Sequence, residues 1–294
     1  MLISIYEKRH KSVFLADHQS HKRKDFEKWF LISSDHHFDS KKSNRKLIKN
    51  HLDKAKERDA DVLMFGDFFD CMGGKYDPRS NKADLRPELQ VANYFDAVVD
   101  QAADFLAPYK DNIKLITKGN HETSVLKHQE VDLIERLGTT LNLKHGAEVQ
   151  TGGYAGYVIL RFYTDMVNKS GMRKKVLSFT HGYGGAAPVT KGTIQTARKA
   201  VYLPEADIVV SGHIHESWML ELAREKLSAG NYKPYLSPQW HIQMPTYKED
   251  FLAGEGWHRE KGISPKPLGA WWLRFFWNGR EDVSGIDFEI IRAK

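Results

Sequence analysis

Short apolar runs alternate with helically spaced segments along most of the chain. Runs typical of buried strands occupy 27–34, 61–65, 113–117, 155–163, 175–180, 207–211 and 217–223. Between them, apolar residues fall on one helix face in the segments 44–57, 88–106 and 189–202. Strands that alternate with helices in this way pack in layers around a sheet, so the pattern predicts an α/β fold.

The composition of the sequence changes after His215, where Pro, Gly and aromatic residues become frequent. Two later segments still alternate like strands, namely AWWLRFFW at 270–277 and IDFEII at 286–291. We therefore interpret this C-terminal region as continued sheet joined by long loops and not as a separate domain.

Length and composition favour one elaborated domain. With 294 residues, of which 41% are hydrophobic, the chain can bury a substantial core. We predict a single domain over residues 1–294, with its core at 27–223 and an aromatic and basic elaboration at 224–294. Residues 1–26 are consistent either with an edge pair of strands or with a mobile basic arm.

Charge and cysteine content bear on the partners and the cellular compartment that we expect for the protein. The net charge of +6 fits a polyanionic partner, but a mildly basic solvated surface is at least as common. Cys71 is the only cysteine, so no intramolecular disulfide can form, which fits a reducing, cytoplasmic compartment. Charges interrupt the N-terminal segment where a signal peptide has its apolar core, and no run approaches the length of a membrane-spanning helix. We therefore expect no membrane partner.

Asp35, His36 and His37 directly follow the first predicted core strand. Side chains alternate on extended backbone, so Asp35 and His37 point the same way and His36 points away, as a packing or surface neighbour. Asp and His suit Zn, Mn or Fe(II), which makes Asp35 and His37 a candidate half of a metal site. A polar turn after a core strand is the simpler explanation of this triplet taken alone.

Metal-type ligands follow other predicted strands at the same place, immediately after the apolar run. These segments are Gly66-Asp67-Phe68-Phe69-Asp70, Gly119-Asn120-His121-Glu122, His181-Gly182 and Gly212-His213-Ile214-His215. Ligands gather at the carboxyl ends of strands in α/β sheets, and glycine lets the backbone turn sharply beside an ion or phosphate. Gly-Asp is common in turns and a lone His is usually structural, but this ordered series indicates one shared site.

The ordered motifs resemble those of the calcineurin-like metallophosphoesterase superfamily, whose pattern is D-x-H, GDxxD, GNH[DE], H and GHxH. Every ligand position of that pattern is filled between Asp35 and His215. The resemblance implies a four-layer α/β fold, a two-sheet sandwich flanked by helices, with two metal ions at the strand ends.

The resemblance also implies a ligand set for each ion. The first ion would be bound by Asp35, His37, Asp67 and His215. The second would be bound by Asp67, Asn120, His181 and His213. Asp67 would bridge the ions, because a carboxylate has two oxygens to share whereas an imidazole does not bridge easily. A mixed oxygen and nitrogen shell fits two divalent ions, for which we expect Mn²⁺ first, with Fe²⁺, Zn²⁺ or Ni²⁺ as alternatives.

Two further residues acquire catalytic roles from the resemblance. His121 would lie over the phosphate and protonate the leaving oxygen or stabilise the transition state. Asp70 would orient His121 by accepting a hydrogen bond from its other ring nitrogen. The simpler interpretations are a helix-capping carboxylate for Asp70 and an ordinary loop residue for His121.

The motifs indicate the type of reaction more clearly than they indicate the substrate. Protein Ser/Thr phosphatases of the superfamily carry Arg-Gly directly after GDxxD, whereas this chain has Cys71-Met72, with Cys71 expected to be buried. The GHIH form is similar to that of DNA repair nucleases and other phosphodiesterases of the superfamily. Gly184-Gly185 fits either backbone amides that meet a phosphate or a plain turn.

Two segments combine cations with aromatic residues. The loop after GDxxD carries Lys75, Arg79, Lys82 and Arg86, and the tail carries Tyr232, Tyr235, Trp240, His241, Tyr247, Trp257 and His258. Interleaved aromatics and cations stack bases and hold backbone phosphates. The alternative is that the aromatics pack the outer sheet while the cations face water.

We therefore expect a dimetal phosphoesterase, and within that class a phosphodiesterase acting on DNA, RNA or nucleotides. A hydroxide that bridges the two metals would attack phosphorus in line. The alternatives are a phosphomonoesterase or pyrophosphatase acting on a small metabolite, and a catalytically silent scaffold that kept the fold for binding. Silent relatives usually show gaps in the ligand set, and this chain has none. The sequence does not predict an oligomeric state.

Overall fold

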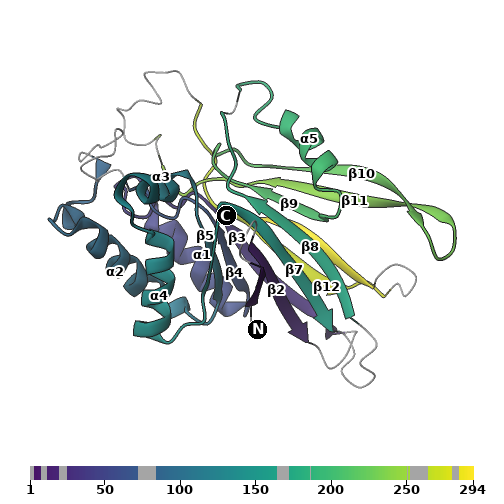
Figure 1. The fold of residues 1–294 in the computed structure, drawn as a ribbon, viewed down its shortest axis with the longest axis horizontal. Coiled ribbons are helices and arrows are strands. Elements are labelled where there is room, and N and C mark those ends of the chain that lie inside the picture. The colour runs from purple at the N-terminus through teal and green to yellow at the C-terminus, as the bar shows by residue number, and fades with distance from the viewer. Residues whose placement is uncertain are drawn as a thin grey trace.

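The computed structural model of the chain describes residues 3–7, 12–19, 25–71, 84–163, 172–185, 187–249, 251, 264–279 and 285–294. Within these residues, two β-sheets stack face to face with helices on both outer sides (Figure 1). The predicted two-sheet α/β sandwich flanked by helices is therefore confirmed.

The two sheets differ in their strand order. The seven-stranded sheet of the described residues contains, in order, β1 (Ile3–Glu7), β2 (Ser12–Gln19), β7 (Ala155–Tyr163), β8 (Met172–Thr180), β9 (Ile208–Ser211), β11 (Lys233–Gln243) and β10 (Trp218–Ser228). The six-stranded sheet contains, in order, β13 (Ile286–Ala293), β12 (Ala270–Trp277), β3 (Glu27–Ser33), β4 (Asp61–Phe65), β5 (Ile113–Thr117) and β6 (Gln150–Gly152). Strands β12 and β13 thus continue the six-stranded sheet, as their alternating pattern predicts, while β10 and β11 extend the seven-stranded one.

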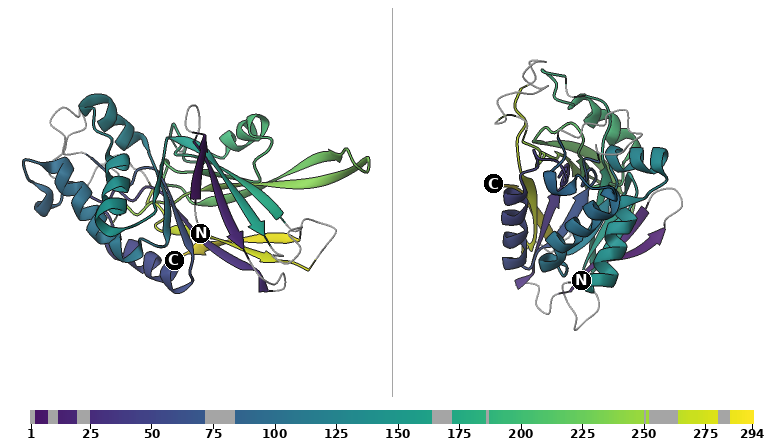
Figure 2. Two further views of the ribbon diagram at one scale, coloured as in Figure 1. Left: turned by 60° about the horizontal axis from the view of Figure 1, so that its bottom comes forward. Right: turned by 90° about the vertical axis from the view of Figure 1, so that its left-hand side faces the viewer.

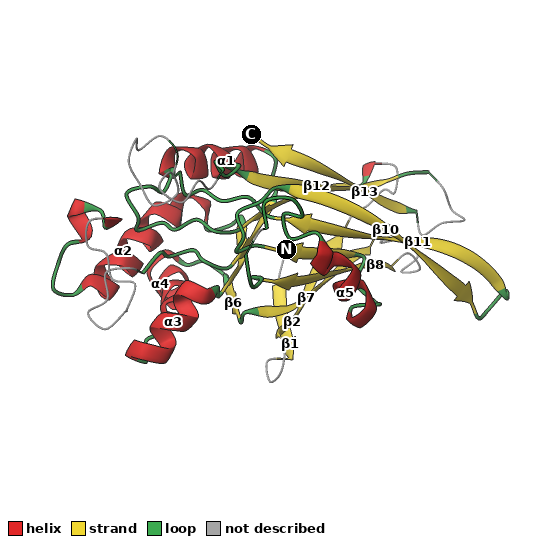
Figure 3. Ribbon diagram, turned by 90° about the horizontal axis from the view of Figure 1, so that it is seen from above, coloured by secondary structure: helices red, strands yellow, loops and turns green. Residues whose placement is uncertain are grey.

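The helices divide between the two outer faces. They are α1 (Arg45–Glu57), α2 (Tyr94–Leu106), α3 (Asn120–Gln129), α4 (Leu133–His145) and α5 (Ile194–Tyr202). Helices α1 to α4 gather on the side of the six-stranded sheet, and α5 lies apart from them (Figures 1 and 3). In α1 the side chain of Asn44 caps the first turn by accepting from the Leu47 amide at 2.9 Å. Ile48, Leu52 and Ala55 form its buried stripe.

Strand β4 shows how the layers are held together. Val62 and Met64 face the helices, whereas Leu63 and Phe65 face the second sheet, and each is at most 1% exposed. Both faces of the strand are buried, which is why its sequence reads as an unbroken apolar run. Each such side chain contributes roughly 1.5–3 kcal/mol of burial free energy.

Several element boundaries differ from the prediction. The helix expected at 88–106 begins only at Tyr94, after a short 3₁₀ turn at Pro87–Leu89. The expected strand 217–223 is longer, because β10 continues to Ser228 and pairs along its whole length with β11. This β10–β11 hairpin projects well beyond the body of the molecule (Figures 1 and 2). Near the N-terminus, β1 and β2 form an antiparallel edge pair.

Parallel pairing brings the ends of the motif-bearing strands together. Strands β3, β4 and β5 run parallel in one sheet, and β8 and β9 run parallel in the other. Carboxyl ends of parallel strands meet at the same edge of a sheet, so the segments that follow them are neighbours. Among the described residues, no helix is long and apolar enough to cross a membrane.

Candidate metal centre

The candidate ligands lie in tight turns directly after their strands. Left-handed backbone is found at Asp35 (φ 53°), His37 (46°), Asp67 (48°), His213 (73°) and His215 (55°). Such conformations are uncommon for residues with a Cβ and cost about 1–3 kcal/mol each. Strand β3 ends at Ser33, so the alternation expected of extended backbone does not apply here, yet Asp35 and His37 still face one site.

Glycine is required where these turns approach the ligands. A Cβ on Gly66, whose φ is +81°, would lie 2.8 Å from Cγ of His181. A Cβ on Gly119 would lie 2.7 Å from Cγ of Asp67. Both distances are far inside van der Waals contact, so a side chain at either position would displace a candidate ligand.

The first ligand group consists of Asp35, His37 and His215, whose donor atoms all lie within 4.8 Å of one another. Nε2 of His215 is 3.2 Å from Oδ1 of Asp35 and 3.3 Å from Nε2 of His37. The hydroxyl of Ser34 donates to Oδ2 of Asp35 at 2.6 Å, and the His213 amide donates to the same carboxylate at 3.1 Å. These donors fix the carboxylate while leaving Oδ1 directed at the two imidazoles.

The second ligand group consists of Asp67, His181 and His213, again within 4.8 Å. Nε2 of His181 is 3.0 Å from Oδ2 of Asp67 and 3.1 Å from Oδ1 of Asn120. The same amide oxygen of Asn120 is 2.7 Å from Nδ1 of His213. Nδ1 of His181 donates to the carbonyl of Phe65 at 3.2 Å, which turns Nε2 toward the group.

The two groups adjoin each other through Asp35 and His181. Oδ1 of Asp35 lies 3.8 Å from Nε2 of His181. Asp67 falls in the second group and not in the first. The bridging role of Asp67 therefore stays a prediction, whereas the convergence of the seven predicted ligand residues on one pocket is a feature of the fold.

Buried negative charge dominates the electrostatics of this pocket. Burial alone would raise the pKa of Asp35, but His181 and His215 lower it to about 2. Burial would likewise lower the pKa of His181, but Asp67 and Asp35 raise it to about 10. The pKa of Asp67 is held well below its usual range, since His181 and His121 outweigh its desolvation. Two ionised carboxylates that are removed from water need positive charge close by to compensate them. Divalent cations meet this need and also suit the oxygen and nitrogen donors of the site.

Asp70 and His121 also lie at the pocket, but their contacts differ from the predicted one. The Asp70 carboxylate Oδ1 lies 2.8 Å from Nδ1 of His37, an ion-pair contact, and accepts from Nζ of Lys248 at 2.8 Å. Its distance to Nδ1 of His121 is 3.7 Å. The backbone carbonyl of Asp70 is what accepts the proton of His121 Nδ1. That bond turns Nε2 of His121 toward the pocket, where it lies 3.7 Å from Oδ2 of Asp67.

Glu122 and Asp39 position the site, and neither of them was assigned a role of its own from the sequence. Glu122, 1% exposed, accepts from the amides of Gly119 (2.8 Å), Phe69 (2.8 Å) and Asp67 (3.2 Å). Asp39 accepts from the amides that follow the GDxxD turn, those of Asp70 and Cys71. Glu122 was visible as the last residue of GNHE, whereas nothing in the local sequence marks Asp39.

The C-terminal segment also reaches the site. Both the Tyr247 amide and the Thr246 hydroxyl donate to the backbone carbonyl of Asp35 at 2.9 Å. The ring of Tyr247 stacks on His36 with centroids 4.9 Å apart, and His36 is 1% exposed. His36 is thus a packing residue and belongs to none of the ligand groups found among the described residues. Lys248 completes this segment through its contact with Asp70.

The residues considered for substrate selection do not gather in one place. Tyr232 and Tyr235 are exposed on the projecting hairpin, whereas Tyr247 is buried. Arg86 donates to the carbonyl of Ser43 at 2.9 Å and so supports a loop. Three loop cations and two tail residues lie outside the described residues, namely Lys75, Arg79, Lys82, Trp257 and His258.

An α/β sandwich with His and Asp clusters at its strand ends defines the metallophosphoesterase class of fold. The chain belongs to the calcineurin-like phosphoesterase family, whose model matches residues 28–217. No curated protein sequence matches the chain.

Solved structures similar to this chain are distant in sequence. Vps29 from Entamoeba histolytica, solved with zinc, shares 11% identity over 90% of this chain and 98% of that one, with a TM-score of 0.35. An uncharacterized protein from Streptococcus pneumoniae, described as a predicted phosphoesterase, shares 12% over 85% and 83%, with a TM-score of 0.30. GAP50 of Plasmodium, the anchor in the inner membrane complex, shares 12% over 91% and 85%, with a TM-score of 0.40.

Proposed function

We propose that this protein is a dimetal phosphodiesterase that acts on nucleic acid or nucleotides, with Mn²⁺ as its preferred ion. The observation that carries the proposal is the convergence of two Asp and His groups, with Asn120 and His121 beside them, at one largely buried site. Two divalent ions held by these groups would acidify a water and neutralise charge on a phosphoryl group.

The protein's own residues have distinct tasks in this proposal. The Asp70 carboxylate lies 2.8 Å from Nδ1 of His37, which leaves Nε2 on the side of the ligand group. The Asp70 carbonyl accepts from Nδ1 of His121, so Nε2 is the ring atom that faces the site and would pass a proton to the leaving oxygen. Glu122 ties the turn that carries Asp67 to the turn that carries Asn120, which holds these two members of the second ligand set together.

A diester is favoured over a monoester by the charge at the site. Cys71 stands where the superfamily's protein phosphatases have an arginine, and it is fully buried and carries no positive charge. A diester bears one negative charge at neutral pH and a monoester close to two, so a site without that arginine suits the diester better. The lone cysteine is also consistent with the cytoplasm as the proposed compartment.

Hydrolysis of bis(p-nitrophenyl) phosphate beside p-nitrophenyl phosphate, with Mn²⁺ present, tests the proposal. We expect a preference for the diester, lost by at least about a hundredfold in His121→Ala and in Asn120→Ala. His128→Ala is the matched control, because His128 is an exposed histidine on the same helix. Preference for the monoester would replace the diesterase with a phosphomonoesterase. Full metal loading without turnover of any phosphoester would identify a binding scaffold instead.

A further inference from the structure

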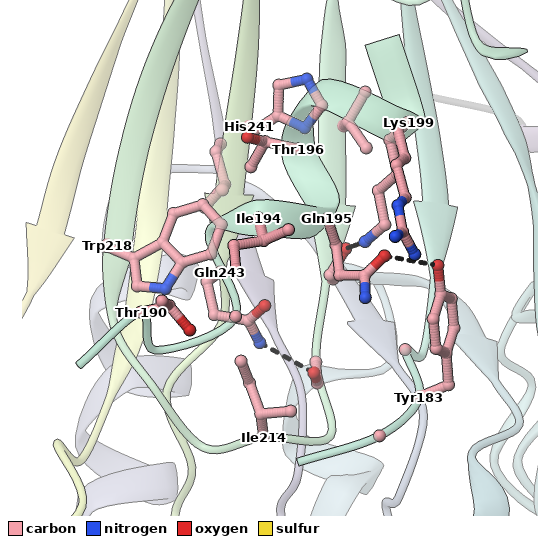
Figure 4. Close-up of a pocket in the computed structure, with 18 of the residues that line it drawn as sticks. Tyr183, Thr190, Ile194, Gln195, Thr196, Lys199, Ile214, Trp218, His241 and Gln243 are labelled. Atoms are coloured by element: carbon pink, nitrogen blue, oxygen red, sulfur yellow. Dashed lines mark hydrogen bonds between the residues drawn. The ribbon is translucent and has the colours of Figure 1, made fainter. Parts of the chain in front are cut away.

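A cavity of about 220 Å³ lies under α5, on the outer face of the seven-stranded sheet (Figure 4). Val209 and Ser211 of β9 and His241 and Gln243 of β11 line it from the sheet side. Trp218 stands on one side, and Tyr183 and Lys199 stand on the other (Figure 4). None of the metal-centre side chains described above lines this cavity.

The cavity nevertheless adjoins the metal centre. Its lining includes Gly182, Gly212 and Ile214, each directly next in the chain to a histidine of the candidate metal centre. The amide of Gln243 donates to the carbonyl of Gly212 at 2.7 Å, which joins the floor of the cavity to the turn that bears those histidines. The cavity and the metal centre therefore share the turns that follow β8 and β9.

The charge of the lining selects the kind of group that fits. Lys199 and Arg198 line the cavity, and no Asp or Glu does. Lys199 is 7% exposed, and its ammonium donates to the hydroxyl of Ser211. In the described part of the chain, no carboxylate lies within ion-pair distance of Lys199 or Arg198, although nearby Lys191 and Glu216 form such a pair at 4.0 Å. A buried ammonium without an acid partner is costly, so an anion would relieve the cost.

The remaining lining suits a phosphate group and not a larger anion. Gln195 and Gln243 provide amide donors, and the hydroxyl of Tyr183 donates to Gln195 at 3.2 Å. The Gly184-Gly185 turn presents backbone with open space around it, since nothing lies within 4 Å of a Cβ built on either residue. Pockets for whole small molecules usually measure roughly 300–1,000 Å³, so this cavity accommodates one group of a larger molecule.

We propose that the cavity binds a second, non-scissile phosphate of the substrate, held by Lys199 and Arg198 while the metal centre holds the scissile one. This inference rests on the proposed phosphodiesterase function and narrows its substrate class to molecules that carry two phosphates, such as phosphorylated nucleotides. It also gives the Gly184-Gly185 turn a role in approaching that phosphate, the first of the two alternatives that its sequence allows.

Thymidine 5′-(p-nitrophenyl phosphate), with and without a 3′-phosphate, provides a matched substrate pair for the holoenzyme. We expect the wild type to prefer the 3′-phosphorylated substrate in kcat/KM by about tenfold or more, the gain typical of a charge-assisted contact. Lys199→Met should abolish that preference, measured as the ratio of the two kcat/KM values. Lys191→Met is the control, because Lys191 is an exposed lysine close to the cavity but outside its lining.

A second readout separates binding from a structural role of Lys199. Replacing a buried ammonium that has no acid partner with methionine should leave the melting temperature unchanged or raise it. If Lys199 had a structural role, the same substitution would lower the melting temperature. Turnover of both substrates at equal kcat/KM, unaffected by Lys199→Met, would overturn the second-phosphate site while the phosphodiesterase stands. Inorganic phosphate that alters turnover of the singly phosphorylated substrate only when Lys199 is present would show a free-anion site and also overturn it. No turnover of either substrate would overturn the underlying function.

Discussion

The contact between Asp70 and His37 leads to a prediction that separates metal binding from proton transfer. Oδ1 of Asp70 lies 2.8 Å from Nδ1 of His37 and accepts from Nζ of Lys248 at 2.8 Å, and its side chain is 3% exposed. Asp70→Asn keeps the shape but removes the charge, and Asp70→Ala removes the contact altogether. Either change frees Nδ1 of His37, so the imidazole no longer presents Nε2 in a fixed direction.

The magnitude follows from the strength of that contact. A buried contact with a charged group at 2.8 Å contributes about 1.5–3 kcal/mol, and about 1.4 kcal/mol corresponds to a factor of ten in affinity. We therefore expect one Mn²⁺ to bind about tenfold more weakly in Asp70→Asn and about a hundredfold more weakly in Asp70→Ala. The second ion should bind as in the wild type, because the Asp70 carboxylate contacts none of its ligands among the described residues.

Isothermal titration of the metal-depleted protein with Mn²⁺ measures both affinities. His121→Ala is the comparison, since it should lose turnover while keeping both metal affinities. If the Asp70 variants keep both affinities and lose only turnover, the carboxylate acts through His121 and the reasoning from His37 is refuted.

Two further predictions concern the turn at Gly119 and the buried His18. Gly119→Ala should abolish binding of at least one metal ion, because its Cβ would lie 2.7 Å from Cγ of Asp67, and elemental analysis of the purified variant would show this. Burial, with a contribution from Lys28, lowers the pKa of His18 to about 3, so the folded state rejects a proton that the unfolded chain accepts below pH 6.5. Stability from this residue is present above pH 6.5 and is lost as the pH falls from 6.5 toward 3. At pH 5 this loss of unfolding free energy is about 2 kcal/mol. Urea unfolding at pH 7.5 and pH 5 should therefore show a smaller difference in unfolding free energy for His18→Phe than for the wild type. An equal difference would contradict the assignment.

The strands that carry the ligands could be predicted because burial leaves a plain mark on their sequence. Strand β4 is buried on both faces, so DVLMF reads as an apolar run that stops where Gly66 turns the chain. Helix α4 leaves no such mark, because LIERLGTTLNLKH contains Gly138 and two threonines, all weak helix formers. Its packing decides the structure, and a Cβ on Gly138 would clash with the side chain of Thr151.

The prolines of β11 concealed a strand in a similar way. Pro234 and Pro238 read as loop residues, yet both pair with β10. On its other side β11 pairs with β9 only from Trp240 to Gln243, so the prolines fall where that side has no strand partner and their missing amide leaves no ladder bond unmade.

The residues that converge on the candidate site could be predicted from the sequence, but the contacts that orient them could not. Asp35 and His37 are marked by their place after a strand, which is a local property of the chain. The partnership of Asp70 with Lys248 joins residues that are far apart in the sequence. It depends on which loops meet at the sheet edge, and motif spacing does not carry that information.

The division of the ligands between the two sheets has a consequence for how the protein is made. Asp35, Asp67 and Asn120 follow strands of the six-stranded sheet, whereas His181 and His213 follow strands of the seven-stranded one. A chain emerging from the ribosome presents the acidic half first, and neither ligand group is complete until residue 213 or 215 has been synthesised and the sheets have docked. Strong capture of a metal ion is thereby postponed to a late stage of folding, when the geometry of the finished pocket, and not the first ion encountered, can decide which metal is kept.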